Sequence, residues 1–127
     1  QSVGPDYIRA LPRRQQMRCE LEEILTEQVD VLLTPTVPIV APKIGQQAVY
    51  LDGREIDLLS ALIHFVCPFS LVGFPSLTLP AGFDDQGLPI SIQVVGRPFD
   101  ETTILQVGYS FENYSGYYER HPYMLTS

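Results

Sequence analysis

The stretch 74–96 most constrains what this chain can fold into. It holds two apolar runs of strand length, 76–80 and 90–95, separated by a segment rich in Asp, Gly and Pro. In the second run Ser91 and Gln93 alternate with isoleucine and valine, the period of two that a strand with one apolar face shows. The pattern predicts a β-hairpin whose apolar residues pack against a core and whose loop is longer than a two-residue turn.

The composition indicates one domain at most. Of the 127 residues 45% are hydrophobic, enough for a core and too many for a disordered chain. The formal net charge is −7, and half of the eight basic residues lie near the N-terminus: Arg9, Arg13, Arg14 and Arg18. An acidic chain of this kind has no general attraction for nucleic acid or for an anionic membrane surface, so neither is expected as a partner.

The two cysteines, Cys19 and Cys67, are too few and too far apart to indicate a disulfide scaffold or a zinc site. We expect buried thiols, which fits a reducing compartment. No apolar run approaches the ~18 residues that cross a bilayer, and the first residues do not follow the pattern of a signal peptide. A cytoplasmic protein without metal or cofactor is therefore expected.

The first helix is expected over 6–29, with Pro12 in the first turn of its main segment, where the missing N–H costs nothing. Arg14 and Arg18 are expected on its solvated charged face. Its apolar stripe follows helical spacing: Met17, Leu21, Ile24 and Leu25. A short buried strand at 31–33 follows, and then an irregular connection over 35–56 with an exposed turn at Asp52-Gly53.

A second helix is expected over 58–66, capped by Asp57 and stopped by Pro68. It is apolar nearly all round, so it should be buried or pressed against a partner, with His64 as a hydrogen-bonded structural histidine. An apolar loop over 68–75 should place Gly73 at positive φ or at a close backbone approach.

A third helix should begin after the hairpin, capped by Asp100, with Phe99 packing on Ile104 as a hydrophobic staple. Its apolar stripe comprises Ile104, Leu105, Gly108 and Phe111. The order of elements predicts an α+β arrangement in which helices cover a short mixed sheet of about three strands. Such a sheet does not form a closed domain well, because the unpaired backbone groups of its outer strands need neighbouring strands.

No complete catalytic constellation is visible in the residues. The serines Ser60, Ser70, Ser76 and Ser91 have no base at a recognisable spacing, and the histidines are His64 and His121. A dyad with Lys43, the only lysine, is a minor alternative. Asp84 and Asp85 fit turn formation better than acid–base chemistry.

A set of short segments occurs in a fixed order: DVLLTPT at 30–36, AP at 41–42, GFP at 73–75, PAG at 80–82, GLP at 87–89, glutamine at 93 and FDE at 99–101. Together they resemble the C-terminal portion of the amidase signature family, over about 7–112. The resemblance implies that residues 1–127 are one C-terminal segment of an amidase domain of the α/β amidase signature fold, with 113–127 as a peripheral tail.

The resemblance also implies a function. Members of the family cleave amide C–N bonds with a Lys–Ser–Ser triad on a Gly/Ser-rich segment, which nothing in this sequence matches. No residue here is therefore expected to be catalytic, and the segment should supply strands, helices and one wall of the pocket for a small-molecule amide.

The expected wall residues are Ile63, Val66, Cys67 and Phe69, although plain core residues are an equal alternative. Glutamine-dependent tRNA amidotransferase subunits have an aspartate at the position of Ile63, where it holds the substrate amino group. They commonly have a threonine at the position of Val66 and an asparagine at that of Ser70. These differences favour an apolar or aromatic amide.

A second hypothesis is a non-catalytic, standalone interaction module derived from an amidase. In either case we expect homo-oligomers or edge-strand contacts for the isolated chain, because its sheet edge and apolar helix would be exposed.

Overall fold

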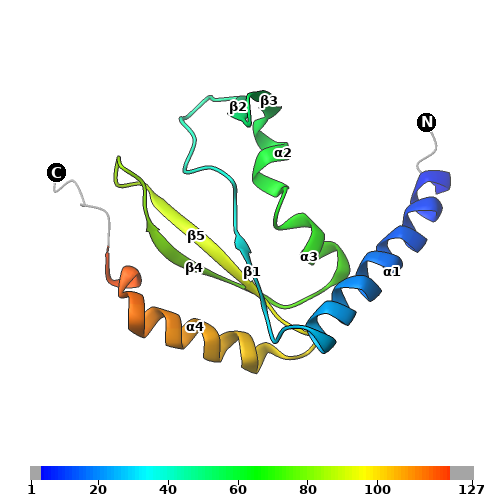
Figure 1. The fold of residues 1–127 in the computed structure, drawn as a ribbon. Coiled ribbons are helices and arrows are strands. Elements are labelled where there is room, and N and C mark those ends of the chain that lie inside the picture. The colour runs from blue at the N-terminus through cyan, green and yellow to red at the C-terminus, as the bar shows by residue number, and fades with distance from the viewer. Residues whose placement is uncertain (1–3, 121–127) are drawn as a thin grey trace.

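The computed structural model describes residues 4–120 (Figure 1). The helices of this part are α1 (Gly4–Glu27), α2 (Leu58–Ile63), α3 (Cys67–Val72), α4 (Glu101–Ser115) and the 3-10 turn η1 (Tyr117–Glu119). The strands are β1 (Leu32–Pro35), β2 (Ala48–Leu51), β3 (Arg54–Asp57), β4 (Ser76–Phe83) and β5 (Pro89–Val95).

The predicted hairpin is confirmed as β4 and β5, which pair antiparallel and form the main sheet with β1 in the order β1-β5-β4. The register shifts between Pro80 and Gly82, so a bulge bends β4 near its end. Asp84 closes the loop: its carboxylate accepts the N–H groups of Gln86 and Leu88 at 2.9 and 2.7 Å. The expected role of Asp84 in the turn is therefore correct.

The predicted α+β class is confirmed, but the pairings differ from the expected mixed sheet. All pairings among residues 4–120 are antiparallel. The expectation of an irregular connection over 35–56 is wrong, because β2 and β3 form a second hairpin there. Their strands are short and mostly exposed, so they lack the alternation that reveals a strand. The turn at Asp52 and Gly53 is as predicted, with both residues at positive φ (49° and 74°).

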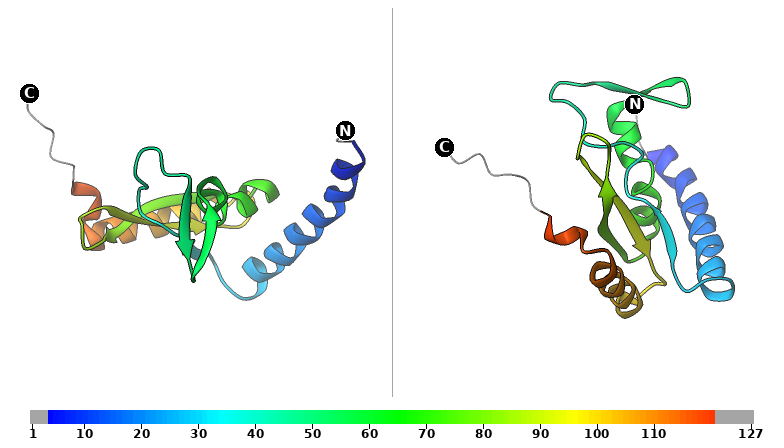
Figure 2. Two further views of the ribbon diagram at one scale, coloured as in Figure 1. Left: turned by 90° about the horizontal axis from the view of Figure 1, so that it is seen from above. Right: turned by 60° about the vertical axis from the view of Figure 1, so that its left-hand side comes forward.

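Helices cover both faces of β5 (Figures 1 and 2). On one face, α4 packs over β4 and β5, and Leu79, Val94 and Ile104 form a core cluster. On the other face, a second cluster joins α1 and α3 to the C-terminal end of β5. Its members are Leu25, Phe69, Val72, Phe74 and Val95. Consecutive valines at the end of β5 are buried because successive side chains point to opposite faces.

Helix α1 is continuous over Gly4–Glu27, so no separate main segment starts near Pro12, which lies in the interior of the helix. An interior proline removes one helical hydrogen bond. That loss falls in the exposed N-terminal half of α1, where water can satisfy the freed carbonyl of the 67% exposed Ile8. The predicted apolar stripe lies in the C-terminal half of α1, where Leu25 is buried and Met17 and Leu21 are partly buried against the core. The N-terminal half projects away from the sheet (Figure 2).

Helix α4 starts where predicted, but three details are wrong. Phe99 has φ 63° and is 93% exposed, so it does not staple onto Ile104. The Asp100 carboxylate accepts from the Thr103 hydroxyl at 2.8 Å and makes no bond to a backbone N–H of the helix. Leu105 is 58% exposed and does not belong to the apolar stripe. Val107 packs against the core cluster in place of Leu105.

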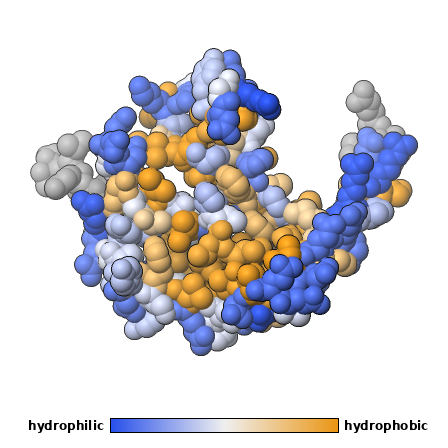
Figure 3. All heavy atoms as spheres, in the orientation of Figure 1, coloured by the Kyte–Doolittle hydropathy of each residue, from blue (hydrophilic) through white to orange (hydrophobic). Residues whose placement is uncertain are grey.

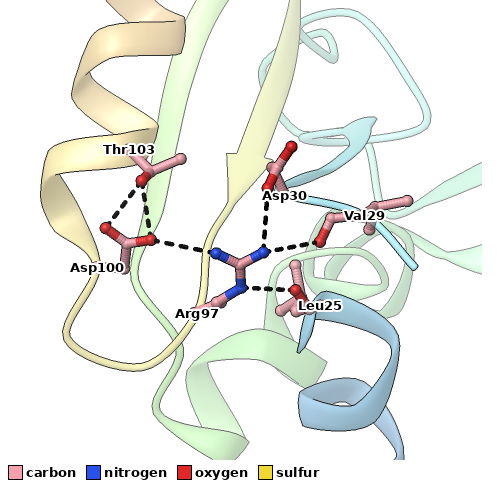
Figure 4. A network of polar contacts seen from close by, with 6 residues as sticks. All are labelled: Leu25, Val29, Asp30, Arg97, Asp100 and Thr103. Atoms are coloured by element: carbon pink, nitrogen blue, oxygen red, sulfur yellow. Dashed lines mark hydrogen bonds and ion pairs between the residues drawn. The ribbon is translucent and has the colours of Figure 1, made fainter. Parts of the chain in front are cut away.

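Arg97 joins three elements at the end of β5 (Figure 4). Its Nε donates to the carbonyl of Leu25 at 2.6 Å, and one terminal nitrogen bonds Asp30 at 3.1 Å and contacts the carbonyl of Val29 at 3.5 Å. The other terminal nitrogen lies 3.9 Å from Asp100. The C-terminal end of α1, the start of β1 and the start of α4 therefore meet on one guanidinium group.

The expected burial of the cysteines is wrong, since both Cys19 and Cys67 are exposed. They lie on the outer faces of α1 and α3, where an apolar thiol has no neighbouring element to cover it. Of the predicted tail, residues 113–120 continue α4 and form η1, where Tyr117 packs edge-on against Phe83. Residues 121–127, with His121, lie outside the described part of the chain.

A substitution of Gly108 should test how closely α4 packs on the hairpin. A methyl group there would collide with the Leu77 side chain and also meet Leu79 at 3.6 Å. Overpacking costs about 1–3 kcal/mol, whereas alanine gains ~1 kcal/mol over glycine in a helix. We therefore expect Gly108→Ala to lower the free energy of unfolding by up to about 2 kcal/mol. Urea denaturation measures the difference. Ser110→Ala, on the exposed side of α4, is the control and should change stability little, whereas a stabilised Gly108→Ala would contradict this packing.

Candidate functional site

The candidate site is the α2–α3 unit, which consists of two short helices joined by residues 64–66. Asp57 caps α2 as predicted: its carboxylate accepts the N–H and the hydroxyl of Ser60 at 3.0 and 3.1 Å. Pro68 does not end this helix. It lies in the first turn of α3, where its missing N–H costs nothing. The predicted loop over 68–75 is therefore mostly helix, which ends at Gly73 with the predicted positive φ of 76°.

The structure places the four predicted wall residues along this unit in different surroundings. Ile63, at the end of α2, is 44% exposed, and Cys67, at the start of α3, is also exposed. Val66 between them is half-buried. Phe69 is only 8% exposed and belongs to the core cluster with Leu25. Ile63, Val66 and Cys67 therefore lie at or beside the turn and are at least partly accessible, whereas Phe69 anchors the unit in the core.

Two arginines of α1 hold the C-terminal end of α3. Arg14 donates to the carbonyl of Leu71 at 2.6 Å, and Arg18 donates to that of Val72 at 2.8 Å. The last carbonyls of a helix lack partners within it and lie at its negative end, so cationic donors stabilise them. Arg14 is exposed as expected, although it bonds Leu71, whereas Arg18 is half-buried rather than solvated and lies 3.8 Å from Glu22.

Gln93 of β5 holds the turn between the helices. Its side-chain amide donates to the carbonyl of Phe65 at 2.8 Å and to the hydroxyl of Thr34 at 2.9 Å. Gln93 is only 2% exposed, although it alternates with apolar residues in a pattern that suggested a polar outer face. That face is covered because α2 and α3 pack over it. The sequence carries no periodic signal for this role.

A groove of about 700 Å³ lies between the β2–β3 hairpin and α2. Its apolar and polar lining includes Leu51, Arg54, Ser60, His64 and Phe65. None of the four predicted wall residues lines it. Ile63, Val66 and Cys67 lie at the other side of the turn and Phe69 lies in the core, so the groove and the predicted wall are different places.

The polar groups of the described chain do not converge. His64 is exposed and packs edge-on against Phe65, and its imidazole makes no hydrogen bond within residues 4–120, unlike the structural histidine we expected. In the same part of the chain the Lys43 ammonium makes no hydrogen bond or ion pair. No group of three or more His, Cys, Asp or Glu among these residues is placed to hold a metal ion.

Comparisons with known proteins identify the family. The model of the Amidase family matches residues 2–105, more than half of the chain. The chain belongs to the amidase family. It is 38% identical over 120 residues to a fatty acid amide hydrolase of Medicago truncatula, covering 94% of this chain and 20% of that protein. It is 40% identical over 118 residues to a glutamyl-tRNA(Gln) amidotransferase subunit of Moorella thermoacetica, covering 91% of this chain and 22% of that protein.

Solved structures of amidases share the fold of this segment. A crystal structure of an amidase matches with a TM-score of 0.83 at 34% identity, covering 89% of this chain and 26% of that one. The structure of 6-aminohexanoate cyclic dimer hydrolase matches with a TM-score of 0.82 at 27% identity, covering 97% and 27%. The chain therefore spans about a fifth to a quarter of the length of these amidases. None of its described helices is long and apolar enough to cross a membrane.

Removing the cap of α2 should loosen the candidate site. We expect Asp57→Ala to lower the free energy of unfolding by about 1 kcal/mol, because the N–H of Ser60 loses its acceptor. Urea denaturation measures this loss, and faster amide hydrogen exchange at 58–61 would localise it. Asp85→Ala, at an exposed position of the loop between β4 and β5, is the matched control for exchange in α2. Equal exchange in both variants would contradict the capping role.

Proposed function

We propose that this chain is the C-terminal part of an amidase that hydrolyses carboxylic amide C–N bonds. The Lys–Ser–Ser triad of such an enzyme would lie outside residues 1–127. The segment would supply strands β1, β4 and β5 to a larger sheet and one wall of the substrate pocket. One observation carries the proposal: the family match extends over residues 2–105, while the chain spans only about a fifth of the relatives.

The uncovered apolar surface supports a larger assembly. Leu33 of β1 lies opposite Val94, so the two side chains share the α4 face of the sheet. Val94 is fully buried, whereas Leu33 is 61% exposed, because α4 covers β4 and β5 but does not reach β1. Figure 3 shows hydrophobic residues gathered over the middle of the molecule. An edge strand that also exposes an apolar side chain is suited to pairing with a further strand.

For the substrate we propose an apolar or aromatic amide. Ile63 and Val66 offer no charge or hydrogen-bond donor, and Ile63 is exposed enough to contact a ligand. A free amino acid such as glutamine would need an acidic partner for its ammonium group. Overall identity does not separate the two kinds of relative, at 38% and 40%. The preference for an apolar amide therefore rests on these side chains alone.

Activity measurements test the proposal. The complete gene product that includes residues 1–127 should hydrolyse phenylacetamide and aliphatic amides and should prefer both to glutamine. The 127-residue chain alone should release no ammonia from any of them. Turnover by the chain alone that is lost on replacing Ser60, Ser70, Ser76 or Ser91 with alanine would contradict the proposal. So would a complete product that is inactive on all three substrates.

We also propose that the isolated chain self-associates through the uncovered edge and face of β1. Sedimentation velocity should show dimers or larger species. Leu33→Lys should shift the distribution toward monomer, because a charged side chain blunts a strand edge. Ile44→Lys is the matched control: Ile44 is more exposed still but lies in the loop between β1 and β2, so the distribution should not change. A clean wild-type monomer would refute the proposal.

A further inference from the structure

We propose that Gln93 is a positioning residue for the substrate wall, which it holds through the backbone of the turn between α2 and α3. This inference rests on the function proposed above. It begins with a buried amide group on the central strand. Burying such a group without hydrogen bonds is costly, so the position of its partners indicates what the side chain does.

The orientation of the amide follows from its partner. The carbonyl of Phe65 can only accept a hydrogen bond, so the atom 2.8 Å from it must be the amide nitrogen of Gln93. The same nitrogen donates to the hydroxyl of Thr34, which in turn lies 3.2 Å from the carbonyl of Pro35. The turn is thereby linked to the two strands β5 and β1 at the middle of the sheet.

The turn has little else to hold it at this point. Ile63, His64 and Cys67 around it are exposed, and the buried side chains of the unit, Ala61 and Phe69, lie in the helices to either side. The carbonyl of Phe65 also lies where α2 has ended and α3 has not begun. Phe69 and the arginines of α1 anchor α3 farther along, and the hydrogen bond from Gln93 ties the turn itself to the sheet.

That setting determines where the predicted wall lies. Ile63 precedes the held carbonyl by two residues, and Val66 and Cys67 follow it directly. A shift of the turn would move all three together with respect to the sheet. Small displacements of this kind weaken binding of the substrate groups that contact the wall and affect smaller substrates less. Gln93, which is 2% exposed, thus acts through the carbonyl of Phe65.

Kinetics of the complete gene product test the inference. Gln93→Met keeps the length of the side chain and removes the donor. We expect the KM for phenylacetamide to rise about tenfold, as for the loss of one buried hydrogen bond. The KM for acetamide, which is too small to reach the wall, should stay within about twofold. Amide hydrogen exchange at 64–68 should be faster in the variant.

Two controls separate this role from a general loss of stability. Thr34→Val removes the other partner of the amide but leaves the bond to Phe65, so it should not raise the KM for phenylacetamide. Gln106→Met makes the same substitution at an exposed position of α4 and should leave both KM values unchanged. If Gln93→Met does not accumulate as folded protein, Gln93→Leu replaces it with the same expected difference between substrates, because its side chain also has no donor for Phe65.

The outcomes are distinct. An equal fall in kcat for both amides with unchanged KM would overturn the positioning role, and so would unchanged exchange at 64–68. An inactive wild-type product would overturn the proposed function instead. The exchange measurement would still decide whether Gln93 holds the turn.

Discussion

The structure depends on β5 being the central strand of its sheet. It pairs with β4, its neighbour in the hairpin, and with β1, which lies about sixty residues earlier in the chain. Each face of its C-terminal end is then covered by a different set of helices, so Gln93, Val94 and Val95 are all buried in succession. A strand buried on both faces leaves no outward position for a polar side chain, which explains why Gln93 must bond inward to Phe65 and Thr34.

Cations at the C-terminal ends of two helices join α1 to the end of β5 and α3 to α1. Neither α1 nor α3 has a basic residue in its last turn. Both obtain one from elsewhere: Arg97 donates to Leu25 near the end of α1, and Arg14 and Arg18 donate to the last carbonyls of α3. The ion pair of Arg97 with the 86% exposed side chain of Asp30 adds little, because water screens it. The bonds to carbonyls matter more, since they satisfy groups that the helices leave without partners.

The sequence predicted the features that neighbouring residues determine. The β4–β5 hairpin follows from alternation and turn residues, the Asp57 cap from its place before an apolar run, and positive φ at Gly73 from the flanking prolines. The features it missed depend on distant contacts. Pro12 is tolerated inside α1 because no element covers that half of the helix, and Cys67 is exposed for the same reason on α3. The burial of Gln93 could not be foreseen, because only the folded chain brings Phe65 over β5.

The contacts within this segment also indicate what it can supply to an enzyme, which is the wall of a pocket and not its reactive groups. Its inner side is rigidly held, with arginine and glutamine side chains bonded to backbone carbonyls and a core around Phe69. Its surface presents Ile63 on the α2–α3 unit and, on the opposite face of the sheet, the uncovered Leu33, both of which expose apolar surface to water. A fixed inner side with an apolar outer side is suited to shaping a pocket whose reactive groups come from another part of an enzyme. Apolar walls of this kind bind and orient a substrate, because contact with them removes its apolar surface from water.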